Sequence, residues 1–398
     1  MNLLAKQIQS MLDRVEKHFE KGGKFHRYYP VYEATRTFFF IPGHSTAGRP
    51  HVRDSLDLKR LMSFVILALV PHFLFGVYNA GYHARLASGL STDFLPVAGK
   101  GLALVLPLVV VSYAVGLFWE GLFAMIRRHN ISEGFLVTGL LYPLVLPPTL
   151  PLWQAAIGIS FGVVIGKEVF GGTGRNLVNP ALTARAFVFF SYPLSISGDS
   201  VWVAVSEGAK RLPDAVSGAT ALAVSAAVTA PSSVETRLAE AGFTLEKLFF
   251  GLYPGSIGET STLLCLIGGI FLCVTGIASY RIMIGGVLGV LGTGYLLNLL
   301  AGPGSSPYLS LDPVYHLVMG GFAFGIAYMA TDPVTGPGMN GSRWLYGFLI
   351  GALTVIVRVF NPAYPDGVML AILFMNLFAP LMDFVEIKIK LRKRIPNV

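Results

Sequence analysis

The sequence predicts an all-helical, polytopic membrane protein with about ten transmembrane helices in two five-helix halves and both termini in the cytoplasm. Three observations lead to this fold class. The 398 residues are 53% hydrophobic and only 13% charged, with a mean hydropathy of +0.62, which lies far outside the composition of soluble domains. The chain contains ten apolar runs, and its lysines and arginines gather at the two ends and in a few connections.

Each apolar run is interpreted as a membrane-spanning helix, because backbone groups in hydrocarbon must be hydrogen-bonded internally and about 20 residues cross the bilayer. The runs are 58–80, 101–126, 133–148, 152–170, 180–194, 261–279, 282–301, 314–330, 343–360 and 367–387. The third and fifth are short and broken by proline, so we expect them to be tilted, kinked or partly re-entrant.

Lysine and arginine positions predict the orientation, because cytoplasmic loops carry the excess. Eleven lie in residues 1–60 and five in residues 387–398, whereas the outward connections 147–151 and 301–312 have none. The outward segment 195–260 has four, but long loops follow the rule poorly. The predicted units are a cytoplasmic amphipathic segment (1–57), a first transmembrane half (58–194), a long periplasmic loop (195–260), a second half (261–387) and a basic cytoplasmic tail (388–398).

The order of five helices, a long loop and five helices indicates an inverted repeat, since each half has an odd number of spans. Glycine and proline interrupt the corresponding connections 166–180 and 328–343. Inverted halves are common in transport folds, so a non-redox solute channel or transporter of the urea-transporter type is one interpretation. Ten helices without internal symmetry are the alternative, because no residue-level repeat is visible.

Several other kinds of site are disfavoured. The formal net charge of +8 follows from the topology and does not indicate nucleic-acid binding. Cys265 and Cys273 are separated by about 12 Å of helical rise, too far for a disulfide, and two cysteines do not complete an iron–sulfur cluster. The eight histidines are scattered, so no resident metal is expected.

Ionisable residues in apolar runs are candidates for function, because a charge at membrane depth is costly. Glu120 is expected at an interface, and Arg358 is expected to snorkel to one. Glu133, Asp332 and Asp383 lie near the predicted ends of helices, where carboxylates beside turn carbonyls suit a hard cation. Interfacial carboxylates that bind no ion would look the same.

The stretch PDAVSGATALA, residues 213–223, is a polar interlude that also has the pattern of a capped helix start, with Ser217 or Asp214 near its N-terminus. Together with other blocks it resembles the B subunits of the sodium-translocating NADH:quinone oxidoreductases. The resemblance is carried by seven stretches in matching order: 18–43, 51–62, 133–154, 166–187, 217–223, 329–347 and 361–383.

This resemblance implies that Thr220 carries FMN through a phosphoester bond. A flavin transferase would recognise the preceding context, which here is Asp214, Ser217, Gly218 and Ala219. The residue types suit this chemistry, because small side chains before the hydroxyl leave room for a phosphate, and a tether keeps the flavin at high effective concentration. The same resemblance implies a non-covalent riboflavin and a region that reduces ubiquinone.

Asn176 and Asn179 are the proposed riboflavin contacts, because amides can pair with an isoalloxazine edge, although Asn179 before a proline is also typical of a simple turn. Tyr28, Tyr29 and Glu33 mark the proposed quinone region, although an interfacial aromatic belt would look similar.

Acidic positions linked to Na⁺ in this family fall on Glu33, Glu133, Asp332 and Asp383. The resemblance further implies a bacterial inner-membrane location and partner subunits that supply NADH oxidation, FAD and iron–sulfur clusters. The chain would then act as one subunit of a Na⁺-transporting NADH:ubiquinone reductase, active only in the assembled complex. Its nearest alternative is the D-type membrane subunit of the related Rnf complexes, which has the same flavinylated threonine, and a purely structural anchor is a third.

Overall fold

The computed structural model describes residues 3–19, 58–127, 134–205, 218–302, 304–361 and 364–392, together with residues 23, 25, 28, 29, 32 and 36. All regular elements in these residues are helices, as the sequence predicts. Six are long and apolar enough to cross a membrane: Leu61–Ala87, Phe94–Arg127, Leu152–Phe170, Tyr280–Leu300, Asn340–Phe360 and Val368–Arg392. The chain is therefore a multi-pass membrane protein, while the span number of ten and the side of each terminus stay predictions.

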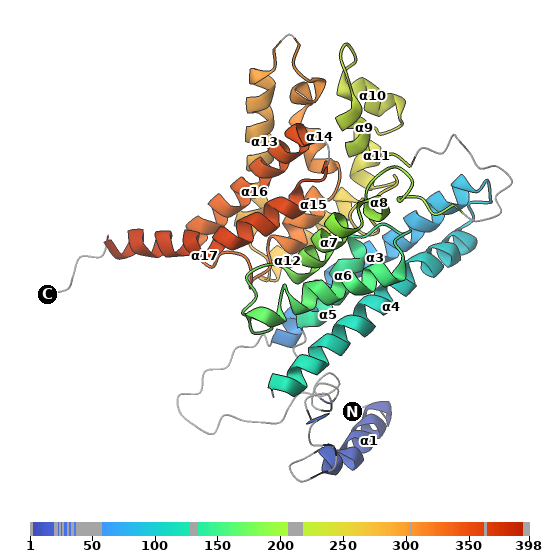
Figure 1. The fold of residues 1–398 in the computed structure, drawn as a ribbon, viewed down its shortest axis with the longest axis vertical. Coiled ribbons are helices and arrows are strands. Elements are labelled where there is room, and N and C mark those ends of the chain that lie inside the picture. The colour runs from blue at the N-terminus through green and yellow to red at the C-terminus, as the bar shows by residue number, and fades with distance from the viewer. Residues whose placement is uncertain are drawn as a thin grey trace.

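The first half is built around one long helix. Its helices are α3 (Leu58–Ala87), α4 (Phe94–Arg127), α5 (Gly134–Leu144), α6 (Leu152–Val164) and α7 (Pro180–Ser191). α4 packs on α3, α5 and α6, and α6 packs on α7 (Figure 1). Asn179 caps α7, with Pro180 in the first helical position, where its missing N–H costs nothing.

The third predicted span is broken, as expected from its prolines. α5 ends at Leu144 although the apolar run continues to residue 148. The freed carbonyl groups find partners at the end of the 195–260 segment, because the Leu144 carbonyl accepts from Gly258 N at 2.7 Å and the Leu146 carbonyl from Ile257 N at 3.1 Å. These hydrogen bonds meet the requirement that backbone groups away from water be paired, and they join the first half to the 195–260 segment.

The second half repeats the long-helix arrangement. Its elements are α12 (Thr262–Val274), α13 (Tyr280–Leu300), α14 (Pro313–Val318), α15 (Phe322–Phe324), a π-helical turn η4 (Gly325–Met329), α16 (Asn340–Phe360) and α17 (Val368–Arg392). α13 packs on α14 and α16, and α16 packs on α17. α17 continues through residues 388–392, so the predicted tail begins as helix and Figure 1 shows it projecting from the bundle.

The eighth predicted span, 314–330, is also interrupted. α14 ends at Val318, and α15 resumes at Phe322 after Gly320, whose φ of 63° lies in the left-handed region that favours glycine. The segment then continues into η4, whose residues are all buried. Broken helices therefore occur at the third helix of each half.

The described part of segment 195–260 is folded. α8 (Pro193–Ile196) leads into it from the end of the fifth predicted span, and the segment itself contains α9 (Ala221–Ala227), α10 (Val234–Glu240) and α11 (Leu245–Phe250). Figure 1 shows α9 to α11 gathered beside α14 at one end of the molecule. Thr220, Ser233 and Thr244 each accept a hydrogen bond from a backbone N–H in the first turn of the following helix. A small apolar core that includes Leu222, Leu238 and other side chains holds these helices together.

Candidate functional site

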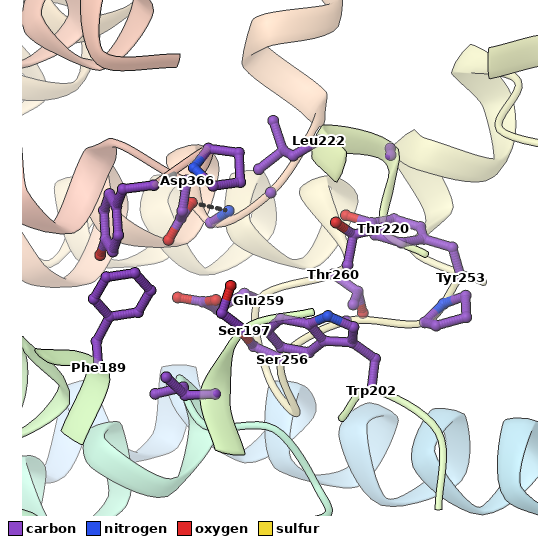
Figure 2. Close-up of a pocket in the computed structure, with 18 of the residues that line it drawn as sticks. Phe189, Ser197, Trp202, Thr220, Leu222, Tyr253, Ser256, Glu259, Thr260 and Asp366 are labelled. Atoms are coloured by element: carbon purple, nitrogen blue, oxygen red, sulfur yellow. Dashed lines mark hydrogen bonds between the residues drawn. The ribbon is translucent and has the colours of Figure 1, made fainter. Parts of the chain in front are cut away.

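One pocket lies where the two halves meet the 195–260 segment, and we call it the Thr220 pocket. It has about 670 Å³ of empty space, its open mouth included. Figure 2 shows Thr220 and Tyr253 at one end, Phe189 and Asp366 at the other, and Trp202 between them. The aromatic side chains come from different segments, so only the folded chain makes this apolar enclosure.

Thr220 occupies the expected helix-start position at the edge of this pocket. Its Oγ1 accepts a hydrogen bond from Ala223 N at 3.2 Å and so caps α9, which leaves the hydroxyl proton unused by the cap. The sequence predicts a capped helix start here, with Ser217 or Asp214 as the cap. The helix start is confirmed, but the residue that caps it is Thr220, and this role is compatible with cofactor attachment. Gly218 is packed so closely that an added Cβ would lie 2.0 Å from the Asp199 carbonyl oxygen. Asp214 and Ser217 lie outside the described residues.

A buried charge cluster forms the floor of the Thr220 pocket. The Arg185 guanidinium lies 2.8 Å from the Asp366 carboxylate and 3.8 Å from that of Glu259. The second Asp366 oxygen accepts from Gly321 N at 3.2 Å. Burial raises the pKa of Glu259, which Arg185 partly opposes. Among the described residues no group donates a hydrogen bond to Glu259 Oε1. A polar ligand in the pocket would therefore find hydrogen-bond donors on the Arg185 guanidinium and an acceptor at Glu259 Oε1.

Arg358 lies behind this pocket, and the expectation that it snorkels to an interface is wrong. Its side chain is fully buried, at 0% exposure. It donates to three carbonyl oxygens: Nε to Asp366 at 3.0 Å, Nη1 to His316 at 2.5 Å and Nη2 to Met319 at 2.9 Å. Snorkelling fails because these carbonyl groups, two of them freed by the broken helix, satisfy the guanidinium inside the protein.

A second pocket, the Asn179 pocket, has about 720 Å³ of empty space with its opening included. It brings together Asn176, Asn179 and Asp332, which the sequence singles out separately, with Lys167 and Tyr328. Asn179 Oδ1 accepts from Ala181 N and Leu182 N, so the expected turn is present as a helix cap. Its amide Nδ2 is then the atom that can donate to a ligand.

Asp332 and Asp383 occupy different environments. Asp332 Oδ1 accepts from Val334 N at 3.1 Å and Oδ2 from the Thr335 hydroxyl at 3.0 Å, and burial raises the pKa of this carboxyl. Asp383, on α17, accepts from Gly338 N at 2.6 Å and Met339 N at 3.0 Å and does not line the Asn179 pocket. Both Asp383 oxygens are therefore engaged by backbone at the start of α16.

Glu120 is buried inside the protein, whereas the sequence suggests a residue in contact with the membrane interface. Its carboxylate and the Lys167 ammonium form an ion pair with side-chain exposures of 2% and 4%. The partners come from α4 and from the connection after α6, where the sequence predicts only a cytoplasmic loop charge. A buried charge is tolerated here because its partner is buried with it.

A polar contact with no counterpart among the sequence-based predictions connects the two pockets. His72, on α3, pairs through Nδ1 with the Gly258 carbonyl at 2.9 Å and through Nε2 with the Tyr328 hydroxyl at 3.0 Å. Tyr328 lines the Asn179 pocket, while Gly258 adjoins Glu259 of the Thr220 pocket. His72 is 1% exposed. A histidine within an apolar run was the sequence signal that could have identified this contact. Its partners could not be found in this way, because Gly258 and Tyr328 are remote from His72 in the sequence.

Of the remaining residues predicted for quinone or Na⁺, the two that the structure describes, Tyr28 and Tyr29, line neither pocket. Tyr28 is exposed and Tyr29 is half-buried, with its ring 6.3 Å from that of Tyr32. Glu33 and Glu133 lie outside the described residues. In the part of the chain that the structure describes, no three His, Cys, Asp or Glu side chains gather in a way that would hold a metal ion.

Comparison with known proteins places this chain in a family. The family model described as NQR2, RnfD, RnfE matches residues 45–391. The chain is 47% identical to a protein of Ectopseudomonas mendocina (strain ymp), with 98% of each chain covered. It is 46% identical to one of Yersinia pestis, covering 97% of this chain and 98% of the relative. It is 44% identical to one of Klebsiella pneumoniae (strain 342), with the same coverage. All three are named as the B subunit of a Na(+)-translocating NADH-quinone reductase.

Proposed function

Because the chain belongs to the NQR2, RnfD, RnfE family, we propose that it is the B-type membrane subunit of a sodium-translocating NADH:quinone reductase. The relatives named as such match it over nearly its whole length, which favours this activity over that of an Rnf subunit. The observation that carries the proposal is the Thr220 hydroxyl at the edge of an enclosed aromatic pocket. Catalysis belongs to the assembled complex, with the other subunits as partners.

The residues of the Thr220 pocket fit FMN esterified to Thr220. Trp202, Phe189 and Tyr364 offer aromatic surface, and Arg185 offers donors to the polar edge of the ring. Bound FMN would supply electron transfer, while the chain holds the ring, excludes water and sets the charge around it. Gly218 leaves no space for a side chain beside the attachment segment. A flavin transferase would act on this segment before the pocket closes around the product.

The residues of the Asn179 pocket fit the proposed riboflavin. Asn179 and Asn176 offer amide groups, and Lys167, held by Glu120, offers a fixed ammonium group. Leu141 and Leu272 add apolar surface. The ring system would thus meet apolar walls and a few polar atoms, the usual composition of a cofactor site.

For Na⁺, we propose that Asp332 is the carboxylate on the path, because it lines a pocket and a bound cation would offset the cost that burial places on its charge. Glu133 and Glu33 remain proposed members of this path. Asp383 would act on it indirectly, by holding the segment that follows Asp332. Ubiquinone reduction is assigned to the N-terminal region around Tyr28, Tyr29 and Glu33, as the family resemblance implies.

We also propose that the two halves are inverted copies of one unit. The supporting observation is the shared pattern of neighbours, with α4 on α5 and α6 in the first half and α13 on α14 and α16 in the second. In both halves the third helix is broken near a pocket. A site between inverted halves suits coupled transport and favours a transport scaffold over a structural anchor.

The test is in-gel fluorescence of the denatured subunit under ultraviolet light. We expect a fluorescent band for the wild type and for Thr220→Ser, which keeps a hydroxyl, and none for Thr220→Val. Thr229→Val is the matched control, because Thr229 is an exposed threonine in the same segment. Fluorescence that persists in Thr220→Val, or a dark wild-type band in cells with the transferase, contradicts the proposal.

A further inference from the structure

We propose that Arg358 is a positioning residue for the cofactor of the Thr220 pocket, acting through the pocket wall that its guanidinium holds in place. This inference rests on the proposed attachment of a flavin to Thr220. It concerns a residue outside the pocket, since Arg358 is not among the residues that line it.

Burying the Arg358 guanidinium inside the protein carries a desolvation cost. Arg358 lies on α16, one of the helices long enough to span a membrane, and is fully buried. Among the described residues no carboxylate lies within ion-pair distance of it, and its guanidinium donates to backbone carbonyl oxygens instead. A buried arginine that only filled space would be replaced at little loss by an apolar side chain. Its presence at this depth points to a function.

The three carbonyl groups that Arg358 contacts belong to two segments, the end of α14 and the loop that holds Asp366. His316 and Met319 provide the carbonyl groups at the broken end of α14, which have no partner in a continuing helix. The third belongs to Asp366, whose carboxylate holds Arg185 and Gly321 N. Arg358 thus ties the end of α14, which leads into the pocket wall at Gly320, to the Asp366 loop that also lines the Thr220 pocket.

The Arg358 guanidinium lies close to the wall of the Thr220 pocket at Gly320. A Cβ added at Gly320 would lie 3.4 Å from Arg358 Nη2 and 2.4 Å from Leu222 Cδ1. Gly320, which lines the pocket, therefore lies directly beside the guanidinium. If these hydrogen bonds of Arg358 are lost, Gly320 and Asp366 shift together, and Arg185 loses the nearer of its two carboxylate partners.

The three hydrogen bonds require the guanidinium group of an arginine. Nε, Nη1 and Nη2 donate in three directions from one plane. Lysine keeps the charge but presents a single ammonium group, so it cannot reach all three carbonyl groups in this fork geometry. The positioning role therefore predicts that lysine does not rescue, whereas a role of charge alone predicts that it does.

The experiment uses the assembled complex with Arg358→Lys and Arg358→Met. Because the flavin is tethered through Thr220, in-gel fluorescence reports whether it was attached, independently of the pocket. Visible circular dichroism of the native complex, with the spectrum of the Thr220→Val complex subtracted, reports the surroundings of that flavin. We expect normal fluorescence and loss of most of the circular dichroism band in both variants. Native bands in both variants, or in Arg358→Lys alone, overturn the inference.

A second variant covers the case in which Arg358 variants do not assemble. Gly320→Ala disturbs the same wall from the pocket side, and we expect the same spectral loss with the flavin still attached. Tyr346→Phe is the matched control, because it removes another buried hydrogen bond of α16, to Asn376 at 2.6 Å, away from this pocket. An unchanged spectrum in Gly320→Ala overturns the positioning role. A dark wild-type band instead removes the proposed function and this inference with it.

Discussion

Replacing Asp383 separates an ion-binding carboxylate from one that stabilises the start of a helix. Its two oxygens accept from Gly338 N and Met339 N, and the neighbouring Glu386 accepts from Gly341 N and Ser342 N. α17 therefore satisfies N–H groups at the start of α16 that the helix itself leaves unpaired. Asparagine keeps an acceptor oxygen without the charge, whereas alanine keeps neither.

The magnitude follows from these hydrogen bonds. Asp383 is half-buried, so water can replace part of what alanine removes. We expect Asp383→Ala to cost about 2 kcal/mol at the start of α16, and Asp383→Asn about 1 kcal/mol or less. A cost of about 2 kcal/mol corresponds to roughly 30-fold faster hydrogen exchange of the amides of residues 338 and 339.

Two assays on the complex check this reasoning. Hydrogen exchange with mass spectrometry follows the segment 338–342, and quinone-reductase turnover is titrated with sodium. For Asp383→Asn we expect near-native exchange and an unchanged sodium concentration at half-saturation, and for Asp383→Ala fast exchange and lower turnover. A raised half-saturation concentration in Asp383→Asn with native exchange would show that the carboxylate binds the ion, and the capping account would fail.

Three further substitutions test packing and charge. Lys167→Met leaves Glu120 buried without its cation and should lower the free energy of unfolding by about 3–5 kcal/mol, measured by thermal or denaturant unfolding. Adding Glu120→Met should restore most of this loss. A double variant no more stable than the single one refutes the pairing. Because burial raises the pKa of Glu259 from its ordinary 4.5, the folded chain holds a proton that the unfolded chain has released, so stability falls as the pH rises from 4.5 through the raised value. Glu259→Gln should flatten this decline in melting temperature against pH, and equal slopes would contradict it. Gly351→Ala would place a Cβ 2.1 Å from the Gly286 carbonyl oxygen and should cost about 3 kcal/mol by separating α13 from α16, whereas an unchanged melting temperature would show that these helices can move apart freely.

Part of the candidate site could be predicted and part could not. Local pattern predicts a capped helix start in residues 213–223, because capping depends on residues within one turn, but it points to Ser217 or Asp214, whereas the structure gives the cap to Thr220. The family resemblance marks Thr220 as an attachment point. Arg185 and Asp366 do not stand out, since their contact joins positions 181 apart. Hydropathy places Glu120 and Arg358 at interfaces because it treats a lone charge as seeking water. In the folded chain, Lys167 and three carbonyl groups satisfy these charges without water.

The amino-acid sequence alone determined the class of this protein and the order of its helices, because apolar run length, proline breaks and capping residues act over a few neighbours. It also located Asn176, Asn179 and Asp332 individually. Only the tertiary structure decided that these three share a pocket, that Asp383 faces backbone amides, and that His72 meets Tyr328 across 256 positions. The physical reason is that a buried polar group is stable only beside its partner, and that partner is brought there by the packing of distant helices.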